Sequence, residues 1–454
     1  MWTRAQLVEE IGKQGLFLLA PDINTQVDAF LRYVESMSYS CSFVSVDEMV
    51  TMFREFVGRI DNTTDLSSTP YVYTFMNKNT ELFDVMMQNG VAIQLNAIRD
   101  NYKHLMPMML TAHINKDLLG VFNSWWRGRT IPASRDGVKE LLWHLRDSFY
   151  ETHIQSLEHL AEKAMGLSLS DQYWVRPSED LTWDKVNFFT NSFSDDIGKL
   201  LLNGDWDGGD LCSPDNTSDG VVKKRWKIIN NIRCLIKGSS STVGYIGAQP
   251  RREVLASKLA RVMLRPFSAK FAVPYTITTF DDEIFSVCPN FVTPNTEYVQ
   301  FNQLVVGRAV RDYKDAFQYC RSFYGEQSFV IDIMLILDYI ILNEDRHTGN
   351  FGLIRDVTTG EIVSPAPIFD TGSSLFHNSI STNVNTVGAK PFHKNHDIQI
   401  SLVNIKNYHE SLILVKEQIV DIYYDVFSES NEGDERIDRM LQILSERINH
   451  LLSL

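Results

Sequence analysis

The apolar run FVIDIMLILDYIIL, from Phe329 to Leu342, constrains the fold more than any other segment of the chain. It is apolar on nearly every side of a helix, yet it is too short to cross a bilayer and contains Asp332 and Asp338. These properties predict a helix in the core of a globular protein, with Asn343 ending it. The polar residues that follow would leave the core as a short, well-anchored loop.

The loop after this run reads NEDRHTGNFGLI and brings a carboxylate, an imidazole and a carboxamide close together. Asp345 and Asn350 have the spacing D-x-x-x-x-N, and twenty residues after Asn350 the run APIF leads into Asp370. Phosphoryl transfer from ATP needs a carboxylate that orients the acceptor hydroxyl and takes its proton, and an amide oxygen and a second carboxylate that hold magnesium. Hard oxygen ligands suit that ion. The pattern predicts Asp345 as the base and Asn350 and Asp370 as ligands of Mg²⁺.

Two other residues of the loop carry separate predictions. Gly349 is expected to let the chain turn tightly, so that Asn350 faces the metal. His347 stands two residues after Asp345. Two roles stay open for this histidine: a hydrogen-bonded structural residue that fixes the loop, or a catalytic residue near the transferred phosphate.

The motifs NEDRHTGNFGLI and PIFDTGSSLF together resemble the catalytic and metal-binding elements of the HipA-like kinases, the bacterial serine/threonine kinases known from toxin–antitoxin modules. The segment GLSLSDQYWVRPSEDLTWDKVNFF is similar to what precedes the kinase core in HipA-like proteins of some Gram-positive bacteria. The Asp-Arg-His order also resembles phosphoinositide kinases. The HipA-like resemblance implies a two-lobed protein-kinase-like fold, ATP and Mg²⁺ as cofactors, a protein substrate, and a separate DNA-binding antitoxin as a candidate partner.

A kinase also needs a lysine on a strand to hold the α and β phosphates, and a glutamate on a nearby helix to position that lysine. RCLIKGSSSTVG places Lys237 at the end of a short apolar strand. QPRREVLASKLARVM predicts a helix with Pro250 in its first turn and Glu253 near its start. The two segments are similar to the HipA-like pattern, which implies that Lys237 and Glu253 serve ATP binding.

The segment CSPDNTSDG, upstream of that lysine, is predicted to be a flexible polar loop with little to pack. In a HipA-like fold this loop would lie over the phosphates, which implies Ser218 and Gly220 as nucleotide-binding residues, although no G-x-G-x-x-G is present. The resemblance also implies slow autophosphorylation on Thr217 or Ser218, the alternative being an ordinary exposed turn. Lys223 and Lys224 either contact phosphate or form a solvated pair.

Residues 210–300 contain short β-branched and aromatic runs separated by Gly, Pro, Asn and Asp, which predicts a sheet with one helix inserted. VPYTITTFDDEIFSVCPNFV is predicted to be a hairpin that turns at Asp281 and Asp282, with its second strand, around Ser286 to Cys288, meeting adenine through backbone groups. After Gln318 the chain is again apolar and helical. A strand-rich region followed by a helix-rich region predicts an α+β protein of two lobes with an active-site cleft between them.

Three regions are predicted along the 454 residues. Residues 1–120 would be mainly helical with an open role, and SVDEMVTMFREFVGR within them has Ser45 and Glu48 at capping-box spacing. Residues 121–310 would form the nucleotide-binding lobe with a preceding helical segment. Residues 311–454 would form a helical lobe that carries the catalytic and metal-binding loops.

The net charge and the cysteines limit the binding partners and the cellular location that can be expected. The net charge of −14 argues against broad binding to nucleic acid or to anionic membranes, because both depend on a positive surface field. Five cysteines without a C-x-x-C pair fit reduced thiols better than a disulfide framework or a zinc site. The first residues do not resemble a signal peptide, so a cytoplasmic location is expected.

The leading hypothesis is therefore an ATP- and magnesium-dependent kinase that transfers the γ-phosphoryl group to a Ser or Thr hydroxyl of a protein. A lipid or small-molecule kinase would use the same chemistry, but the acidic charge and the lack of a basic amphipathic helix disfavour lipid as the acceptor. A kinase-shaped module that holds nucleotide or a partner without turnover is the third alternative. Retention of Lys237, Asp345, Asn350 and Asp370 disfavours that module.

Overall fold

A computed structural model describes most of the chain after residue 69 and two residues before it. The described residues are 6–7, 70–114, 117–135, 137–139, 141–142, 156–203, 211–218, 220, 222–240, 245, 247–280, 283–305 and 310–454. The helix expected within SVDEMVTMFREFVGR lies outside them.

Residues 71–96 form three strands, so the prediction of a mainly helical region through residue 120 is wrong for this part of the chain. The strands are β1 (Tyr71–Asn77), β2 (Thr80–Gln88) and β3 (Val91–Asn96), which join β4 (Tyr173–Arg176) in an antiparallel sheet of order β3-β2-β1-β4. Asn89 and Gly90 link β2 to β3, and both have positive φ angles, of 50° and 85°. An Asn-Gly pair favours this type of two-residue hairpin turn.

The first sheet packs against a helix that covers one of its faces. Helix α5 (Leu118–Arg127) contributes Phe122 and Trp126 to a buried cluster with Phe75 of β1 and Phe83 of β2. The other helices of this part are α4 (Met108–Thr111), α7 (Leu157–Lys163), α8 (Trp183–Val186) and α9 (Asp196–Asn203).

A second antiparallel sheet has the order β5-β6-β8-β7. Its strands are β5 (Lys224–Ile229), β6 (Ile232–Lys237), β7 (Thr276–Phe280) and β8 (Glu283–Pro289), and α10 (Ala248–Met263) lies between β6 and β7 in the chain. The predicted sheet with one inserted helix is thus confirmed. The predicted hairpin is also confirmed, because Phe280 pairs with Glu283 across the turn.

The third sheet, of order β11-β10-β9, joins segments from either side of residue 310. Its strands are β9 (Thr296–Gln300), β10 (Gly352–Asp356) and β11 (Ile362–Pro365). The strand-like run APIF contributes only one bridge, between Ile368 and Ala272. This bridge ties the chain just before Asp370 to the segment that follows α10.

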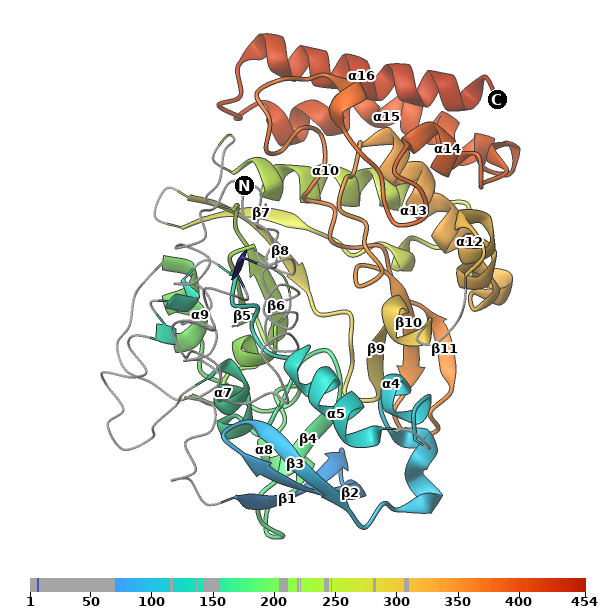
Figure 1. Ribbon diagram of the computed structural model, residues 1–454. Helices are drawn as coiled ribbons and strands as arrows, with labels where there is room; N and C mark the ends of the chain where they lie inside the picture. The colour runs from blue at the N-terminus through green and yellow to red at the C-terminus, as the bar shows by residue number, and fades with distance from the viewer. Residues whose placement is uncertain are drawn as a thin grey trace.

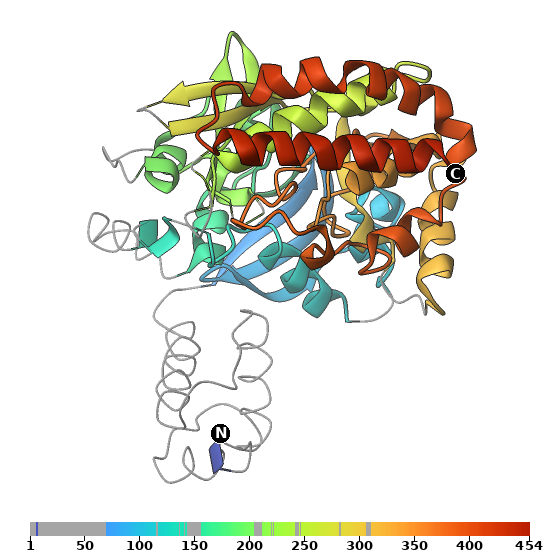
Figure 2. The ribbon, with the colours of Figure 1, turned by 90° about the horizontal axis from the view of Figure 1, so that it is seen from above.

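The C-terminal part is mainly helical and contains the predicted core helix. The helices are α11 (Phe301–Leu304), α12 (Tyr313–Ser322), α13 (Phe329–Ile340), α14 (His396–Ile400), α15 (His409–Phe427) and α16 (Asp434–Leu452). Residues 330–343 are all buried, although α13 ends two residues before Leu342, which has a φ of 52°. Figure 1 shows α10 between the second sheet and the C-terminal helices, and Figure 2 shows α15 and α16 side by side.

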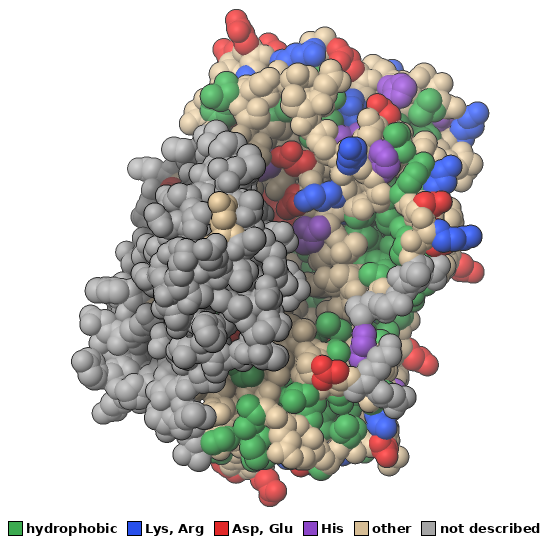
Figure 3. Space-filling model, viewed as in Figure 1, with side chains coloured by type: hydrophobic (Ala, Val, Ile, Leu, Met, Phe, Trp, Pro, Cys, Tyr) green, Lys and Arg blue, Asp and Glu red, His purple; other side chains and the backbone are tan. Residues whose placement is uncertain are grey.

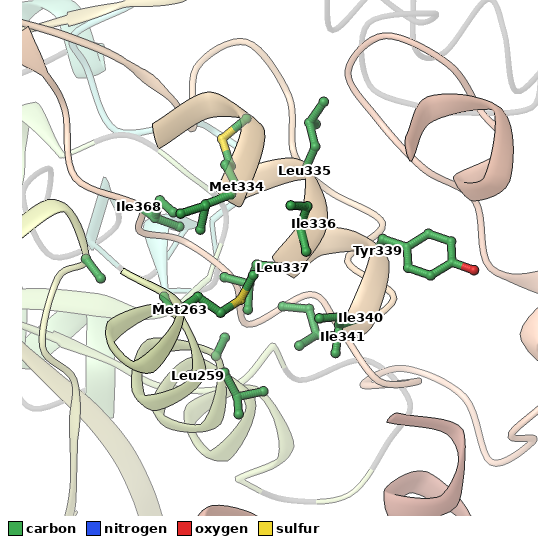
Figure 4. Packing of buried hydrophobic residues seen from close by; sticks show 14 of the residues in the cluster. Leu259, Met263, Met334, Leu335, Ile336, Leu337, Tyr339, Ile340, Ile341 and Ile368 are labelled. Carbon is green, nitrogen blue, oxygen red and sulfur yellow. The ribbon is translucent and has the colours of Figure 1, made fainter. Parts of the chain in front are cut away.

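The largest core lies where α10 and α13 meet. Met263 of α10 lies beside Leu337 of α13 in Figure 4, and both belong to one buried cluster that extends to α15 and α16. This core therefore fixes the end of α13, from which the predicted catalytic loop leaves.

The structure confirms the α+β class, with three antiparallel sheets in the described residues. The four cysteines among these residues are Cys212, Cys234, Cys288 and Cys320, and none of the four forms a disulfide. None of the helices in the described ranges has the length and hydropathy needed to span a bilayer.

Candidate active site

A cleft of about 820 Å³ contains every site residue that the sequence analysis selected. Its lining comes from the second sheet and α10, from the segments after α13, and from parts of residues 109–132, 168–171 and 298–303. The selected residues in its lining are Ser218, Gly220, Lys237, Glu253, Asp345, His347, Asn350 and Asp370. Residues separated by up to 152 positions in the sequence therefore share one cavity.

Lys237, the last residue of β6, lies at the centre of the site. Its Nζ is 3.0 Å from Oε1 of Glu253 on α10 and 2.6 Å from Oδ1 of Asp370. The side chains of Lys237 and Glu253 are 7% and 4% exposed, whereas that of Asp370 is 36% exposed. The lysine therefore links the sheet, α10 and the loop of Asp370 through one buried cation.

The electrostatics of the cleft keep the charges of Lys237 and Asp370 in place. Burial alone would lower the pKa of Lys237, but the carboxylates of Asp370 and Glu253 raise it well above its usual value. Burial would likewise raise the pKa of Asp370, but the charges of Lys237, Lys224 and Arg346 hold it below its usual range. Asp370 is thus a carboxylate, and Lys237 an ammonium, at neutral pH.

The predicted catalytic loop is held by Arg346, which the sequence analysis does not select. Its fully buried guanidinium makes two bonds to Asp338 of α13, from Nε at 2.9 Å and from the second terminal nitrogen at 3.0 Å. Its other terminal nitrogen donates to the carbonyls of Asn350, at 3.0 Å, and Phe369, at 2.6 Å. One side chain therefore fixes the loop of Asp345 and the loop of Asp370 to the same helix.

The residues expected to hold Mg²⁺ have the right donor chemistry. Asn350 is buried and donates its amide nitrogen to the carbonyl of Asp345 at 3.1 Å, which leaves the amide oxygen as the atom for a cation. Asp370 adds carboxylate oxygen. No group of three or more His, Cys, Asp or Glu that could hold a metal occurs in the described ranges. A site with two protein oxygens suits Mg²⁺, which keeps several waters and is completed by substrate phosphates.

The backbone at Asp370 is unusual. Its φ of 56° lies in the left-handed region, which few residues other than glycine adopt, and such conformations concentrate at functional sites. Two residues further on, a Cβ built at Gly372 would lie 3.2 Å from Cγ of Glu253. The small residue after Asp370 thus lets its loop approach the glutamate that positions Lys237.

Asp345 and His347 lie at the more exposed side of the cleft. The Asp345 side chain is 47% exposed, and one of its oxygens is 2.8 Å from Nζ of Lys390. The Nδ1 of His347 accepts a bond from the backbone N–H of Gly349 at 3.1 Å. Acidic, basic and histidine side chains gather near the middle of the face in Figure 3.

Gly349 acts differently from the expectation. Its φ is not positive, so a left-handed turn is not the reason for a glycine here. A Cβ at this position would lie 2.9 Å from Cε1 of His347, which is closer than real Cβ atoms approach. The glycine therefore makes room for the imidazole.

The segment that contains Ser218 is not the exposed flexible loop that the sequence predicts. Residues 213–218 are buried, and Pro214–Thr217 form a short 3-10 helix. The Thr217 hydroxyl donates to the carbonyl of Leu167 at 2.7 Å. The Ser218 hydroxyl donates to the carbonyl of Asp215 at 2.9 Å and accepts from Arg135 at 2.7 Å. Tertiary partners hold both hydroxyls, which the local polarity of the sequence does not reveal.

Gly220 and Lys224 complete the wall on this side. Gly220 has a φ of 91°, and a Cβ there would lie 2.6 Å from Nζ of Lys224. Lys224 is buried and pairs with Lys237 across β5 and β6. Lys224 is therefore not half of a solvated pair, and it adds a second cation to the cleft.

An apolar part of the cleft lies next to β8. Cys288, Pro289 and Asn290 line it, with Leu235 of β6 and Phe369 of the opposite wall. Of the stretch from Ser286 to Cys288 that is predicted to meet adenine, Cys288 is the residue found among those that line the cleft.

The chain resembles solved structures in its fold. No family model and no curated protein matches the sequence. The structure is similar to that of the proinflammatory kinase CtkA of Helicobacter pylori, with 18% identity and a TM-score of 0.40 over 52% of this chain and 92% of that chain. It is also similar to HipA of a toxin–antitoxin system of Shewanella oneidensis MR-1, in a complex with HipB and operator DNA. Here the identity is 10% and the TM-score 0.48, over 84% of this chain and 99% of that chain.

Likenesses at this level of identity concern the fold and carry no residue roles.

Proposed function

We propose that this chain is a HipA-like kinase that uses ATP and Mg²⁺ to transfer the γ-phosphoryl group to a Ser or Thr hydroxyl of a protein. The observation that carries the proposal is the buried Lys237, held 3.0 Å from Glu253 and 2.6 Å from Asp370 in a cleft that Asp345 and Asn350 also line. A strand lysine paired with a helix glutamate and facing a metal-binding carboxylate is the arrangement that kinases need for ATP.

The residues divide into three tasks. Lys237 binds the phosphates of ATP, and Glu253 keeps the lysine in position when Asp370 turns to the metal. Asn350 and Asp370 would hold Mg²⁺, which neutralises phosphate charge when bound. Asp345 orients the acceptor hydroxyl and takes its proton as the new oxygen–phosphorus bond forms and the bond to the β–γ bridging oxygen breaks.

The remaining parts of the cleft serve binding. Lys224 lies on the same side as Lys237 and adds charge that favours the phosphates. Gly220 and Ser218 line the cleft above them, and the apolar wall at residues 288–290 accepts the base. His347 fixes the loop through its bond to Gly349.

A role as the toxin of a toxin–antitoxin pair, with a separate DNA-binding antitoxin as partner, is part of the same proposal. It rests on the family resemblance of the motifs. A small reading frame with a helix-turn-helix next to this gene would support it, whereas an isolated gene would count against it.

Calorimetry of ATP binding tests the proposed site. Wild-type protein should bind ATP more tightly with Mg²⁺ than without it, and Asp370→Ala should remove both this gain and turnover, because it deletes a metal ligand and a compensating charge. Asp425→Ala, which removes an exposed carboxylate paired with Lys258 on the surface, is the matched control and should leave both unchanged. Equal affinity with and without Mg²⁺, together with full activity of Asp370→Ala, would refute the assignment.

A further inference from the structure

Lys390 is the nearest cation to the proposed base, and neither the motifs nor the resemblance selects it. Its Nζ lies 2.8 Å from Oδ1 of Asp345, and the two side chains are 54% and 47% exposed. An ion pair this exposed contributes at most about 1 kcal/mol to stability. Stability therefore does not account for a lysine placed against this carboxylate.

The backbone around Lys390 is fixed by one buried side chain. Gln399 of α14 is 3% exposed, and its amide nitrogen donates to the carbonyl of Lys390 at 2.8 Å. Its amide oxygen accepts from the N–H groups of Phe392, at 3.0 Å, and His393, at 3.2 Å. A further bond of 2.9 Å, from the N–H of Ala389 to the carbonyl of residue 394, closes the loop.

An aromatic anchor holds the same loop from the other side. The ring of Phe392 lies 5.4 Å from that of Phe317 and 6.2 Å from that of Phe351, just after the catalytic loop. The backbone at Lys390 is thus fixed, while its ammonium is exposed and lies against Asp345, which lines the cleft. A fixed stem with a mobile charged end can change partners at low cost.

The other cations described around the catalytic loop serve other positions. Lys237 and Lys224 lie on the side of the second sheet, where the proposed function places the phosphates of ATP. Arg346 is buried behind the loop on Asp338 and two carbonyls. The phosphoryl group in transfer carries negative charge on three oxygens, and a cation on the acceptor side stabilises it. Lys390 is placed on that side, beside the group that receives the acceptor proton.

We propose that Lys390 is a further catalytic residue, which leaves its ion pair with Asp345 and donates a hydrogen bond to an oxygen of the transferred phosphoryl group. The proposal rests on the proposed kinase function. The acceptor oxygen forms its bond to the γ-phosphorus as the bond to the bridging oxygen breaks, and ADP leaves with that electron pair. The acceptor proton goes to Asp345, and Lys390 stays protonated throughout.

Binding of a transition-state mimic separates this role from a structural one. ADP with aluminium fluoride and Mg²⁺ imitates the planar phosphoryl group, so a residue that acts on it should matter for this complex and not for ADP alone. In calorimetry, Lys390→Met should weaken the aluminium fluoride complex by about 10- to 100-fold, below the loss for a fully buried donor because the lysine is exposed. Its affinity for ADP should stay within about two-fold, as expected for a contact made only in the transition state.

Turnover and two further variants complete the test. Lys390→Met should lower kcat by a factor similar to its loss for the mimic, with KM for ATP nearly unchanged, and Lys390→Arg should restore much of both. Lys394→Met, which removes an exposed lysine four residues further on in the same loop, should match wild type. Thermal unfolding should be the same for all these proteins.

Three other results would contradict the proposal, each in a different way. If Lys390→Met equals wild type with the mimic and in turnover, the lysine is only a surface ion pair. If it is faster than wild type, the ion pair restrains Asp345, and the catalytic role is wrong. If wild-type protein binds neither ATP nor the mimic, the proposed function itself fails, and the role of Lys390 with it.

Discussion

Replacement of Lys237 by methionine should destabilise the protein strongly at neutral pH. The variant leaves the carboxylates of Glu253 and Asp370 facing each other without their shared cation. Removing one partner of a buried ion pair costs about 3–5 kcal/mol. Glu253 is 4% exposed and Asp370 36%, so water relieves only the second carboxylate. We therefore expect a loss at the lower end of that range, about 3 kcal/mol in the free energy of unfolding.

The pH dependence of this loss follows from the pKa shifts. Folding lowers the pKa of Asp370, so its contribution to stability is present above the pKa of the unfolded chain and is lost as pH falls. Folding raises the pKa of Lys237, so its contribution is complete below the usual lysine pKa and is lost only in strong alkali. The difference between wild type and Lys237→Met should therefore be constant from about pH 6 to 9 and shrink as pH falls below about 5.

Urea unfolding followed by circular dichroism at pH 7 and pH 4 measures both statements. Lys258→Met is the matched control, because Lys258 lies on the same helix as Glu253 and pairs with Asp425 at the surface. The control should lose no more than about 1 kcal/mol, as an exposed pair does. A loss below about 1 kcal/mol for Lys237→Met at pH 7, or an equal loss at pH 4, would show that the triad is not the buried ion network described above.

Three other predictions concern the loops around the cleft. Asp338→Ala should cost about 3–5 kcal/mol in urea unfolding, because it leaves the buried Arg346 without its carboxylate; a smaller loss would mean that water enters. Burial raises the pKa of Asp215 to about 7, so its ionisation weakens the native state as pH rises. The free energy of unfolding of Asp215→Asn should therefore increase relative to that of wild type between pH 5 and 8, and an unchanged difference between the two proteins would contradict the shift. Autophosphorylation of Thr217 or Ser218 should be slow and should release their loop, since both hydroxyls are buried; intact mass and peptide mapping after incubation with Mg²⁺ and ATP would show it, and phosphate only elsewhere would exclude it.

Local spacing predicts which residues share the cleft, because most of them stand on short segments of the sequence. Asp345 and Asn350 are five residues apart on one loop, and the apolar run before them identifies the helix that anchors it. The pairing of Lys237 with Glu253 was predicted from a strand and a helix that are neighbours in the sequence. The structure brings these segments to one cleft, as the motif order implies.

The first sheet was predictable in part but was missed. YVYTFMN and TELFDVMMQNGVAIQLN contain β-branched and aromatic residues and an Asn-Gly turn, which together favour a hairpin. The helical pattern before residue 60 does not continue into these two segments. The fourth strand, β4, lies about a hundred residues after β1, and no pattern in either segment predicts that the two strands pair.

The contacts that the sequence does not predict are between residues far apart in the chain. The burial of Ser218 depends on Arg135, 83 residues earlier, and the contact of Lys390 with Asp345 spans 45 residues. The role of Arg346 is partly predictable from the sequence. Asp338 stands inside an apolar helix, and a buried carboxylate needs a cation or a hydrogen bond. Arg346, eight residues further on, provides that cation.

The most direct test of the account is phosphoryl transfer from γ-labelled ATP to the proteins of a dephosphorylated bacterial extract, with wild type and Asp345→Asn compared in the presence of Mg²⁺. The account predicts label in phosphoserine or phosphothreonine with wild type. It predicts transfer slower by at least about 100-fold with the variant, whose ATP affinity should stay within a few-fold of wild type. Equal labelling by the two proteins, or no labelling by a wild type that binds ATP and Mg²⁺, would contradict it.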